Sequence, residues 1–294
     1  MINNNLVFYR EIAKKNGFWL WTILLFLGVF YLNLVWKALG NIDDLITNIL
    51  FYGAVLGLIW RRRDRINLNS NFFASFLGLS LLVVIVIKTL SLFSFESNLL
   101  SLVPFCAGLG VALIASGLRG LRQYGQELFF AWFLFFPTGL IGNFIDNIVK
   151  ITVLNAKFAT YCLYYLGFNV INRGNEVILS LPSLGNYKAI VDYSCAGMPM
   201  ILLMLKLSLL LVSFFPVAKS QCFSIPMVSI VIGFVLGVVR VCILTLAIPE
   251  QATFDYWHGT EGSQIFSTAA IMIFAAFAYW MLNRDGLLDS SHAT

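Results

Sequence analysis

Three side chains with the chemistry for nucleophilic catalysis lie in the C-terminal half of the sequence. Cys195 stands in VDYSCAGMPM (191–200), between a polar run with glycine and asparagine and a long apolar run. Arg240 lies inside an apolar stretch, and His258 stands in DYWHGTEG (255–262), ahead of the last one. A cysteine beside a guanidinium or an imidazolium ionises readily and becomes a usable nucleophile. The three residues therefore predict acyl transfer through a thiolate, with the histidine protonating the departing amine.

The residues around Cys195 support this chemistry. We expect the thiol at the start of a helix, where free backbone N–H groups lower its pKa and can hold an oxyanion. Gly197 lets a substrate backbone approach, and Pro199 suits a first helical turn, where no donor is needed. Asp192 could orient His258, bind a substrate amine or simply cap the helix. We predict Asp192 and Gly197 as substrate-binding residues, with capping as the alternative for Asp192.

The elements that must carry these residues are transmembrane helices. Of the 294 residues, 60% are hydrophobic and 11% charged, against roughly 25% charged in an average soluble domain. Apolar stretches of about 17–25 residues, enough to cross a bilayer core, recur along nearly the whole chain. We expect an all-α integral membrane protein, with one polytopic domain over residues 1–294. The basic residues stand at the ends of apolar segments, so nucleic acid is excluded as a partner.

Hydropathy predicts about eight transmembrane helices and one insertion before the sixth. We place the helices near 18–36, 45–60, 72–90, 99–117, 128–149, 196–216, 224–248 and 264–282. In the long connection 150–194, residues 150–167 have the spacing of a helix on the membrane face. Residues 168–194 alternate apolar and polar types, which predicts short strands with turns at 173–175 and 183–186. This helix and β-hairpin insertion delivers the chain to Cys195.

The distribution of Lys and Arg predicts the orientation. With the N-terminus (1–17) in the cytoplasm, the short outer loops hold only Lys37 and Lys88. We therefore expect a multi-pass protein of the plasma (inner) membrane with both termini cytoplasmic. Segment 150–194 and the active site then lie outside the cytoplasm. Eleven basic residues face inward: Arg10, Lys14, Lys15, Arg61, Arg62, Arg63, Arg65, Arg119, Arg122, Lys219 and Arg284.

In this topology Cys195, Arg240 and His258 come from three consecutive helices at one depth. Arg240 is eight residues before Ile248, which places it about 12 Å below the outer helix end. An arginine at that depth costs several kcal/mol unless it is paired or hydrated, and so marks a functional site. The plain alternatives are a snorkelling arginine, a structural thiol and a histidine bonded to its own loop. The coincidence of all three residues favours function.

No metal or organic cofactor is predicted. The five cysteines are an odd number, have no C-x-x-C spacing and lie mostly inside apolar runs, which argues against a disulfide framework or a zinc site. They are Cys106, Cys162, Cys195, Cys222 and Cys242.

These motifs resemble the exosortase/archaeosortase family of membrane-embedded cysteine transpeptidases. The resemblance rests on Cys195-Ala196-Gly197 at the outer start of one helix, Arg240 in the next and His258 before the last. It covers residues 165–262 as motifs and 20–282 as a hydropathy pattern. It implies that Cys195 is the nucleophile, that Arg240 stabilises the thiolate or oxyanion, and that His258 is the acid/base. The catalytic helices would then lie within 195–282.

The resemblance also implies the partners. The substrates would be membrane-anchored proteins with a C-terminal sorting signal, typically a short Pro-Glu-Pro-like motif, a transmembrane helix and a basic tail. The family cleaves the signal outside the cytoplasm and transfers the new carboxyl end to an acceptor nucleophile, which the sequence does not identify.

The sequence departs from the family pattern near two of the motif residues. Ala196 stands where serine is common, Met198 and Pro199 follow where an arginine is common, and Gly237 stands where asparagine is common. These departures suggest a divergent subfamily, for which the cyanobacterial type is a candidate.

Two other functions are open. In a transporter or permease, Arg240 and Lys206 would line a path for a small anionic solute, although the two halves show neither a repeat nor paired interrupted helices. In a non-catalytic membrane scaffold, Cys195 would be inert. Either would tolerate a blocked Cys195, whereas a cysteine transpeptidase would not.

Overall fold

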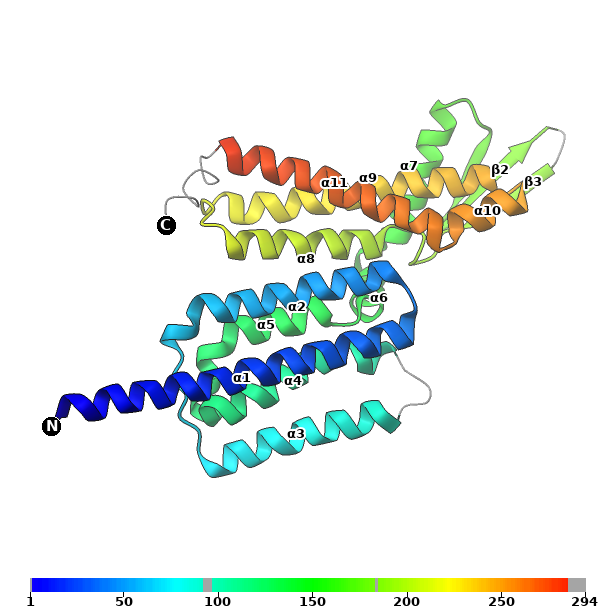
Figure 1. Cartoon of the computed structure of the whole chain (residues 1–294). Helices are drawn as coiled ribbons and strands as arrows, with labels where there is room; N and C mark the ends of the chain where they lie inside the picture. The colour runs from blue at the N-terminus through cyan, green and yellow to red at the C-terminus, as the bar shows by residue number, and fades with distance from the viewer. Residues whose placement is uncertain (1, 92–96, 183–184, 285–294) are drawn as a thin grey trace. The chain divides into compact units, whose positions relative to one another are not determined.

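The chain is a multi-pass membrane protein of the all-α class, as the sequence predicts. The computed structural model describes residues 2–91, 97–182 and 185–284. Within these ranges six helical segments are long and apolar enough to cross a membrane: Trp19–Leu39, Ile42–Arg65, Phe72–Thr89, Leu99–Phe135, Gln221–Ala247 and Thr260–Arg284. The chain forms two compact units, Met1–Pro137 and Thr138–Thr294 (Figure 1). The predictions of eight crossings and of one domain stay predictions.

Unit 1 is a helical bundle. Helix α5 packs against α2 and α4, and α3 packs along α4. Arg62 forms an ion pair with the buried Glu127 of α5, with 3.1 Å between Nη1 and Oε1. The elements in chain order are α1 (Ile2–Leu39), α2 (Ile42–Arg62), the short 3-10 helix η1 (Arg63–Arg65), α3 (Phe72–Ser91), α4 (Ser97–Gly120), η2 (Leu121–Tyr124) and α5 (Gly125–Phe135).

The prediction of one helix over 128–149 is wrong at its centre. Helix α5 ends at Phe135 and α6 (Thr138–Val149) begins after Pro137. Phe136 is extended, with φ −57° and ψ 138°. Proline lacks the N–H that continues a helix and disfavours the helical conformation in the residue before it. Pro137 therefore separates two short helices, and it is also the last residue of unit 1.

Unit 2 combines helices with a small antiparallel sheet. Helices α8, α9 and α11 run side by side, and α7, the strands and α10 gather toward one end of them (Figure 1). The elements are α6, α7 (Ile151–Tyr165), β1 (Val170–Arg173), β2 (Glu176–Leu181), β3 (Gly185–Ile190), α8 (Met198–Phe214), α9 (Gln221–Ala247), α10 (Gln251–His258) and α11 (Thr260–Arg284).

The helix and strands predicted for 150–194 are confirmed. The sheet has the order β1-β2-β3 with antiparallel pairing throughout. Gly174 adopts a positive φ of 65° in the turn between β1 and β2, a conformation that glycine reaches without a steric penalty. The second predicted turn, 183–186, lies partly outside the described residues.

One apolar core joins the sheet to α7 and α9. Val177 and Leu179 alternate along β2 and point to the same face, which packs on α7. Small side chains of α7 fill the space beneath. Most of this core consists of Ala156, Ala159, Leu163, Val177, Leu179, Val191, Ala196, Val238 and Val241. The core therefore fixes both α9 and the segment that precedes α8 relative to the sheet.

Helices α8 and α9 approach each other closely through glycine. Gly233 and Gly237 are spaced four residues apart on α9 and face the start of α8. A Cβ on Gly237 would lie 2.9 Å from the Cα of Gly197, and one on Gly233 would lie 2.8 Å from the Cα of Ile201. Backbones that come this close in a membrane require small residues at the contact. The first turn of α8 is thus seated directly on α9.

Candidate active site

Cys195 lies in a tight turn between β3 and α8. Asp192 organises this turn: its Oδ1 accepts the N–H of Cys195 at 2.9 Å and the hydroxyl of Ser194 at 2.8 Å. The backbone carbonyl of Asp192 accepts the N–H of Ala196 at 2.9 Å. Asp192 therefore caps the turn that contains Cys195 and not α8 itself, whose N-cap is Gly197 without a side-chain hydrogen bond. The N–H groups of Cys195 and Ala196 are therefore occupied, and an oxyanion hole formed by the N–H groups at the start of α8 stays a prediction.

Gly197 is the N-cap residue, directly before the first residue of α8, and has a positive φ of 70°. It is buried, and a Cβ at this position would lie 2.6 Å from the Cα of Gly237. Both the conformation and the contact require glycine. These features show a packing role for Gly197, and its role in binding substrate stays a prediction.

Arg240 lies behind the turn and faces the protein interior. It is only 6% exposed, and its Nη1 donates to the carbonyl oxygen of Ser194 at 3.0 Å. Its Nε is buried without a hydrogen-bond partner among the described residues. The guanidinium carbon is 6.0 Å from the ring centroid of Phe266 on α11. The alternative that Arg240 snorkels to lipid headgroups is therefore wrong, because the guanidinium holds the Cys195 turn against α9.

Asn155 on α7 is a second support for the turn that the sequence analysis missed. It is fully buried, and its Nδ2 donates to the carbonyl oxygen of Ala196. Its Oδ1 has no hydrogen-bond partner among the described residues. The signal in the sequence was an amide side chain within the helical pattern of 150–167, on the face that carries Ala156 and Ala159. A buried amide in an otherwise apolar face indicates a polar partner elsewhere in the fold.

Cys195 and His258 line one cavity of about 180 Å³. Asp192 lines it as well, with residues 188–191 at the end of β3 and parts of α9 and α10. His258 is the last residue of α10, is exposed, and stacks on Phe254 with 5.2 Å between ring centroids. Arg240 is outside this lining. The structure thus brings the predicted nucleophile and acid/base to one cavity and places the predicted arginine behind the nucleophile.

The surroundings of Cys195 disfavour its ionisation. Burial raises the pKa of this thiol from its ordinary 9.0 to about 11, and the charge and hydrogen bond of Asp192 add to the rise. The Ser194 hydroxyl and the positive charge of Arg240 act in the opposite direction but are outweighed. The thiolate predicted from the sequence is therefore not the resting form. In the resting protein Cys195 is a thiol.

Asp192, in contrast to Cys195, is ionised. Burial is the largest influence on its pKa and raises it, but hydrogen bonds from Cys195 and Ser194 lower it, as does the charge of His258. The balance holds the pKa of this carboxyl below its ordinary value of 3.8. Asp192 is thus a carboxylate at neutral pH, and it interacts electrostatically with both Cys195 and His258.

The described residues contain no group of three or more His, Cys, Asp or Glu side chains that could hold a metal ion. Residues 36–275 match a protein-family model described as transmembrane exosortase. The match includes Cys195, Arg240 and His258. No curated protein and no solved structure matches the chain.

Proposed function

Because the chain belongs to the transmembrane exosortase family, we propose that it is a cysteine transpeptidase or protease that cleaves C-terminal sorting signals. Its substrates are exported membrane-anchored proteins, and cleavage takes place at the outer face of the plasma membrane. The observation that carries the proposal is that Cys195 and His258 line the same cavity at the end of β3. A nucleophile and an acid/base at one cavity are the minimum that acyl transfer requires.

The proposed reaction has two stages. The Sγ of Cys195 bonds to the scissile carbonyl carbon while its proton passes to His258. The C–N bond then breaks, and His258 returns the proton to the departing amine. The acyl group stays on Cys195 as a thioester until an acceptor nucleophile, or water, takes it and releases the thiol.

Arg240 and Asp192 influence the first stage in opposite directions. The charge of Arg240 lowers the pKa of Cys195 and so favours the nucleophilic thiolate, while Asp192 raises it. A positive charge that forms beside Asp192 offsets the effect of this carboxylate on the pKa of Cys195. His258 acquires such a charge when it takes the thiol proton. Asp192 therefore stabilises the imidazolium in the same step in which Cys195 loses its proton.

The scissile segment binds in extended form beside β3. Among the described residues β3 pairs only with β2, so its other edge is free to hydrogen-bond an added strand. Residues 188–191, at the end of β3, line the cavity that contains Cys195. The cavity volume of about 180 Å³ is below the roughly 300–1,000 Å³ of small-molecule pockets, so the cavity holds only a short stretch of the substrate around the scissile bond.

Co-expression with a reporter substrate tests the proposal. The reporter carries a C-terminal sorting-type signal, and its processing is compared for wild type, Cys195→Ser and the control Cys222→Ser, at matched protein level and membrane insertion. Cys222 is an exposed cysteine outside the cavity. We expect wild type and Cys222→Ser to shorten the reporter and Cys195→Ser to leave it intact. Shortening by Cys195→Ser at the wild-type rate would contradict the assignment of the nucleophile.

A second readout traps the intermediate. The thioester on Cys195 is labile to hydroxylamine, so mass spectrometry of denatured wild type should detect a substrate-derived adduct on the Cys195 peptide that hydroxylamine removes. The adduct should be absent from Cys195→Ser.

A further inference from the structure

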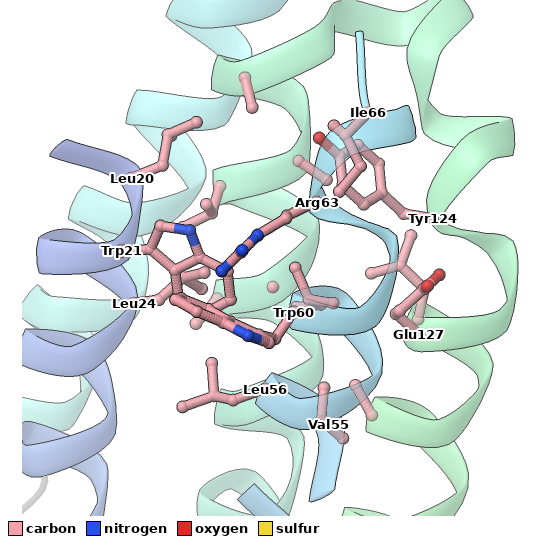
Figure 2. A pocket seen from close by; sticks show the side chains of 18 of the residues that line it. Leu20, Trp21, Leu24, Val55, Leu56, Trp60, Arg63, Ile66, Tyr124 and Glu127 are labelled. Atoms are coloured by element: carbon pink, nitrogen blue, oxygen red, sulfur yellow. The ribbon is translucent and has the colours of Figure 1, made fainter. Parts of the chain in front are cut away.

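Unit 1 contains a separate cavity of about 970 Å³ between α1, α2, α4 and α5. Its depth is apolar, with lining residues such as Leu24, Leu56 and Ala112. Figure 2 shows Trp21 extending from α1 toward Trp60 and Arg63, with Tyr124 and Glu127 on the side away from α1. The polar lining residues are Arg63, Asp64, Asn67, Asn69, Tyr124 and Glu127, together with Tyr52, whose hydroxyl donates to the carbonyl oxygen of Leu24. The cavity is therefore apolar along most of its length and polar at the end where α2 is followed by η1.

Hydrogen bonds hold the polar end in place. The backbone of Asn67 accepts hydrogen bonds from Ser116 Oγ at 2.7 Å and Gln123 Nε2 at 3.1 Å. Its N–H donates to Gln123 Oε1 at 3.1 Å. Segment 66–71, which follows η1, is thus fixed to α4 and η2. These hydrogen bonds fix the backbone that forms the mouth of the cavity.

Arg63 is the cation at this mouth. Its guanidinium carbon lies 4.1 Å from the ring centroid of Trp60, which orients it. Its ion pair with Asp64 is long, at 3.9 Å, and Asp64 is 93% exposed, so the pair is weak. Glu127, the other acidic residue of the lining, is paired with Arg62 at 3.1 Å. Arg63 therefore retains hydrogen-bond donors for an anionic group.

The charged groups at the mouth leave Arg63 as the side chain that can bind an anion. The lining carries one arginine and two carboxylates, but Glu127 is paired with Arg62, and Asp64 is 93% exposed and only weakly paired with Arg63. Cationic side chains between transmembrane helices recur in binding sites for anionic lipid headgroups. Trp21 and Trp60, whose ring centroids are 5.0 Å apart, supply the aromatic residues typical of the membrane–water boundary. We propose that this cavity binds one anionic phospholipid, with its phosphate at Arg63 and its acyl chains between α1, α2 and α4.

The size of the cavity suits a single lipid-sized ligand. The cavity falls at the upper end of the roughly 300–1,000 Å³ range of small-ligand pockets. All lining residues of this cavity belong to unit 1, and all those of the Cys195 cavity belong to unit 2, so the two proposals rest on different residues.

Native mass spectrometry of the full-length protein in detergent tests the proposal. The protein is titrated with phosphatidylglycerol or phosphatidylcholine of identical acyl chains. We compare wild type with Arg63→Gln, which removes the cation at the mouth, and Ala112→Leu, which fills the apolar depth. The matched control is Arg65→Gln, which removes the same charge from an exposed residue outside the lining. Melting temperatures in detergent establish that each variant is folded.

We expect one phosphatidylglycerol to be retained at least about fivefold more strongly than phosphatidylcholine. Arg63→Gln should remove this preference, and Ala112→Leu should weaken binding of both lipids, while Arg65→Gln should stay within about twofold of wild type. Equal retention of the two lipids by wild type, or equal effects of Arg63→Gln and Arg65→Gln, would overturn the proposal. Since Arg63 is exposed, its variant remains informative even if Ala112→Leu fails to fold. No substrate is present, so loss of cleavage activity cannot be mistaken for loss of lipid binding.

Discussion

Replacement of Asp192 by asparagine should make Cys195 more reactive. The carboxylate raises the thiol pKa through its charge and hydrogen bond, in addition to the larger effect of burial. Asparagine keeps an oxygen that can accept the N–H of Cys195, so the turn should persist while the charge is lost. The variant therefore separates the electrostatic role of Asp192 from its capping role.

The pKa values set the expected magnitude. With a pKa of about 11, roughly one Cys195 thiol in a thousand is ionised at pH 8, against about one in ten at the ordinary value of 9.0. Relief of the whole increase would raise the alkylation rate about a hundredfold. Burial persists in Asp192→Asn, so we expect an increase of about three- to tenfold. The rate is proportional to the thiolate fraction, since the thiolate is the reacting species.

The assay is alkylation by a small uncharged reagent, followed by peptide mass spectrometry between pH 7 and 9.5. Exposed Cys222 in the same molecule reports reagent activity. In wild type the logarithm of the Cys195 rate should rise with a slope near one throughout this range, because the range lies below the pKa of about 11. The control Glu250→Gln removes a carboxylate that bonds to Thr253, outside the Cys195 turn. A wild-type plateau with a midpoint below pH 8.5, or slower alkylation of Asp192→Asn, would refute this account of the electrostatics.

Three further predictions concern the supports of the turn. Arg240→Gln should slow Cys195 alkylation at a given pH, because it removes the positive charge that lowers the thiol pKa, and the same assay measures this. Gly237→Ala should destabilise unit 2 by about 1–3 kcal/mol, because the added Cβ would meet the backbone of residues 196 and 197. In the control Gly139→Ala the added Cβ has no neighbouring atom within 4 Å, so this variant should be neutral or slightly stabilising. The midpoints of SDS titrations in mixed micelles measure the stability of both variants. The lowered pKa of Asp192 contributes stability that is present above its unfolded value, near 3.8, and lost as the pH falls through the folded value. Unfolding midpoints from pH 6 to 3 should therefore fall less steeply for Asp192→Asn, and equal slopes would contradict the pKa assignment.

The helices were predictable because a span is a local property. Residues 72–90 are apolar over the whole length of a bilayer core, and α3 occupies almost that range. The predicted span 128–149 failed because neighbouring helices often compensate for a proline inside a membrane helix, and a hydropathy pattern does not show whether they do. At Pro137 the chain is not helical.

The residues of the candidate site were easier to find than their interactions. Cys195 and His258 drew attention by their types and positions, and they do line one cavity. The protonation state of the Cys195 thiol was not predictable from the sequence. Its pKa depends on burial and on the hydrogen bonds and charge of Asp192, and residue spacing shows neither. Asn155 was missed for the same reason, since its partner, the carbonyl of Ala196, is 41 residues away along the chain. The catalytic roles themselves stay predictions until the variants are measured.

The contact between Gly197 and Gly237 limits how this sequence can evolve. With only backbone between α8 and α9 at this point, a side chain at either position must push the two helices apart. Such a shift would also move the carbonyl of Ser194 away from Arg240. An asparagine at 237 would therefore require a joint change of the packing around residues 196 and 197. Positions 196, 197 and 237 should accordingly covary among relatives of this sequence, with the small residues gained or lost as a set.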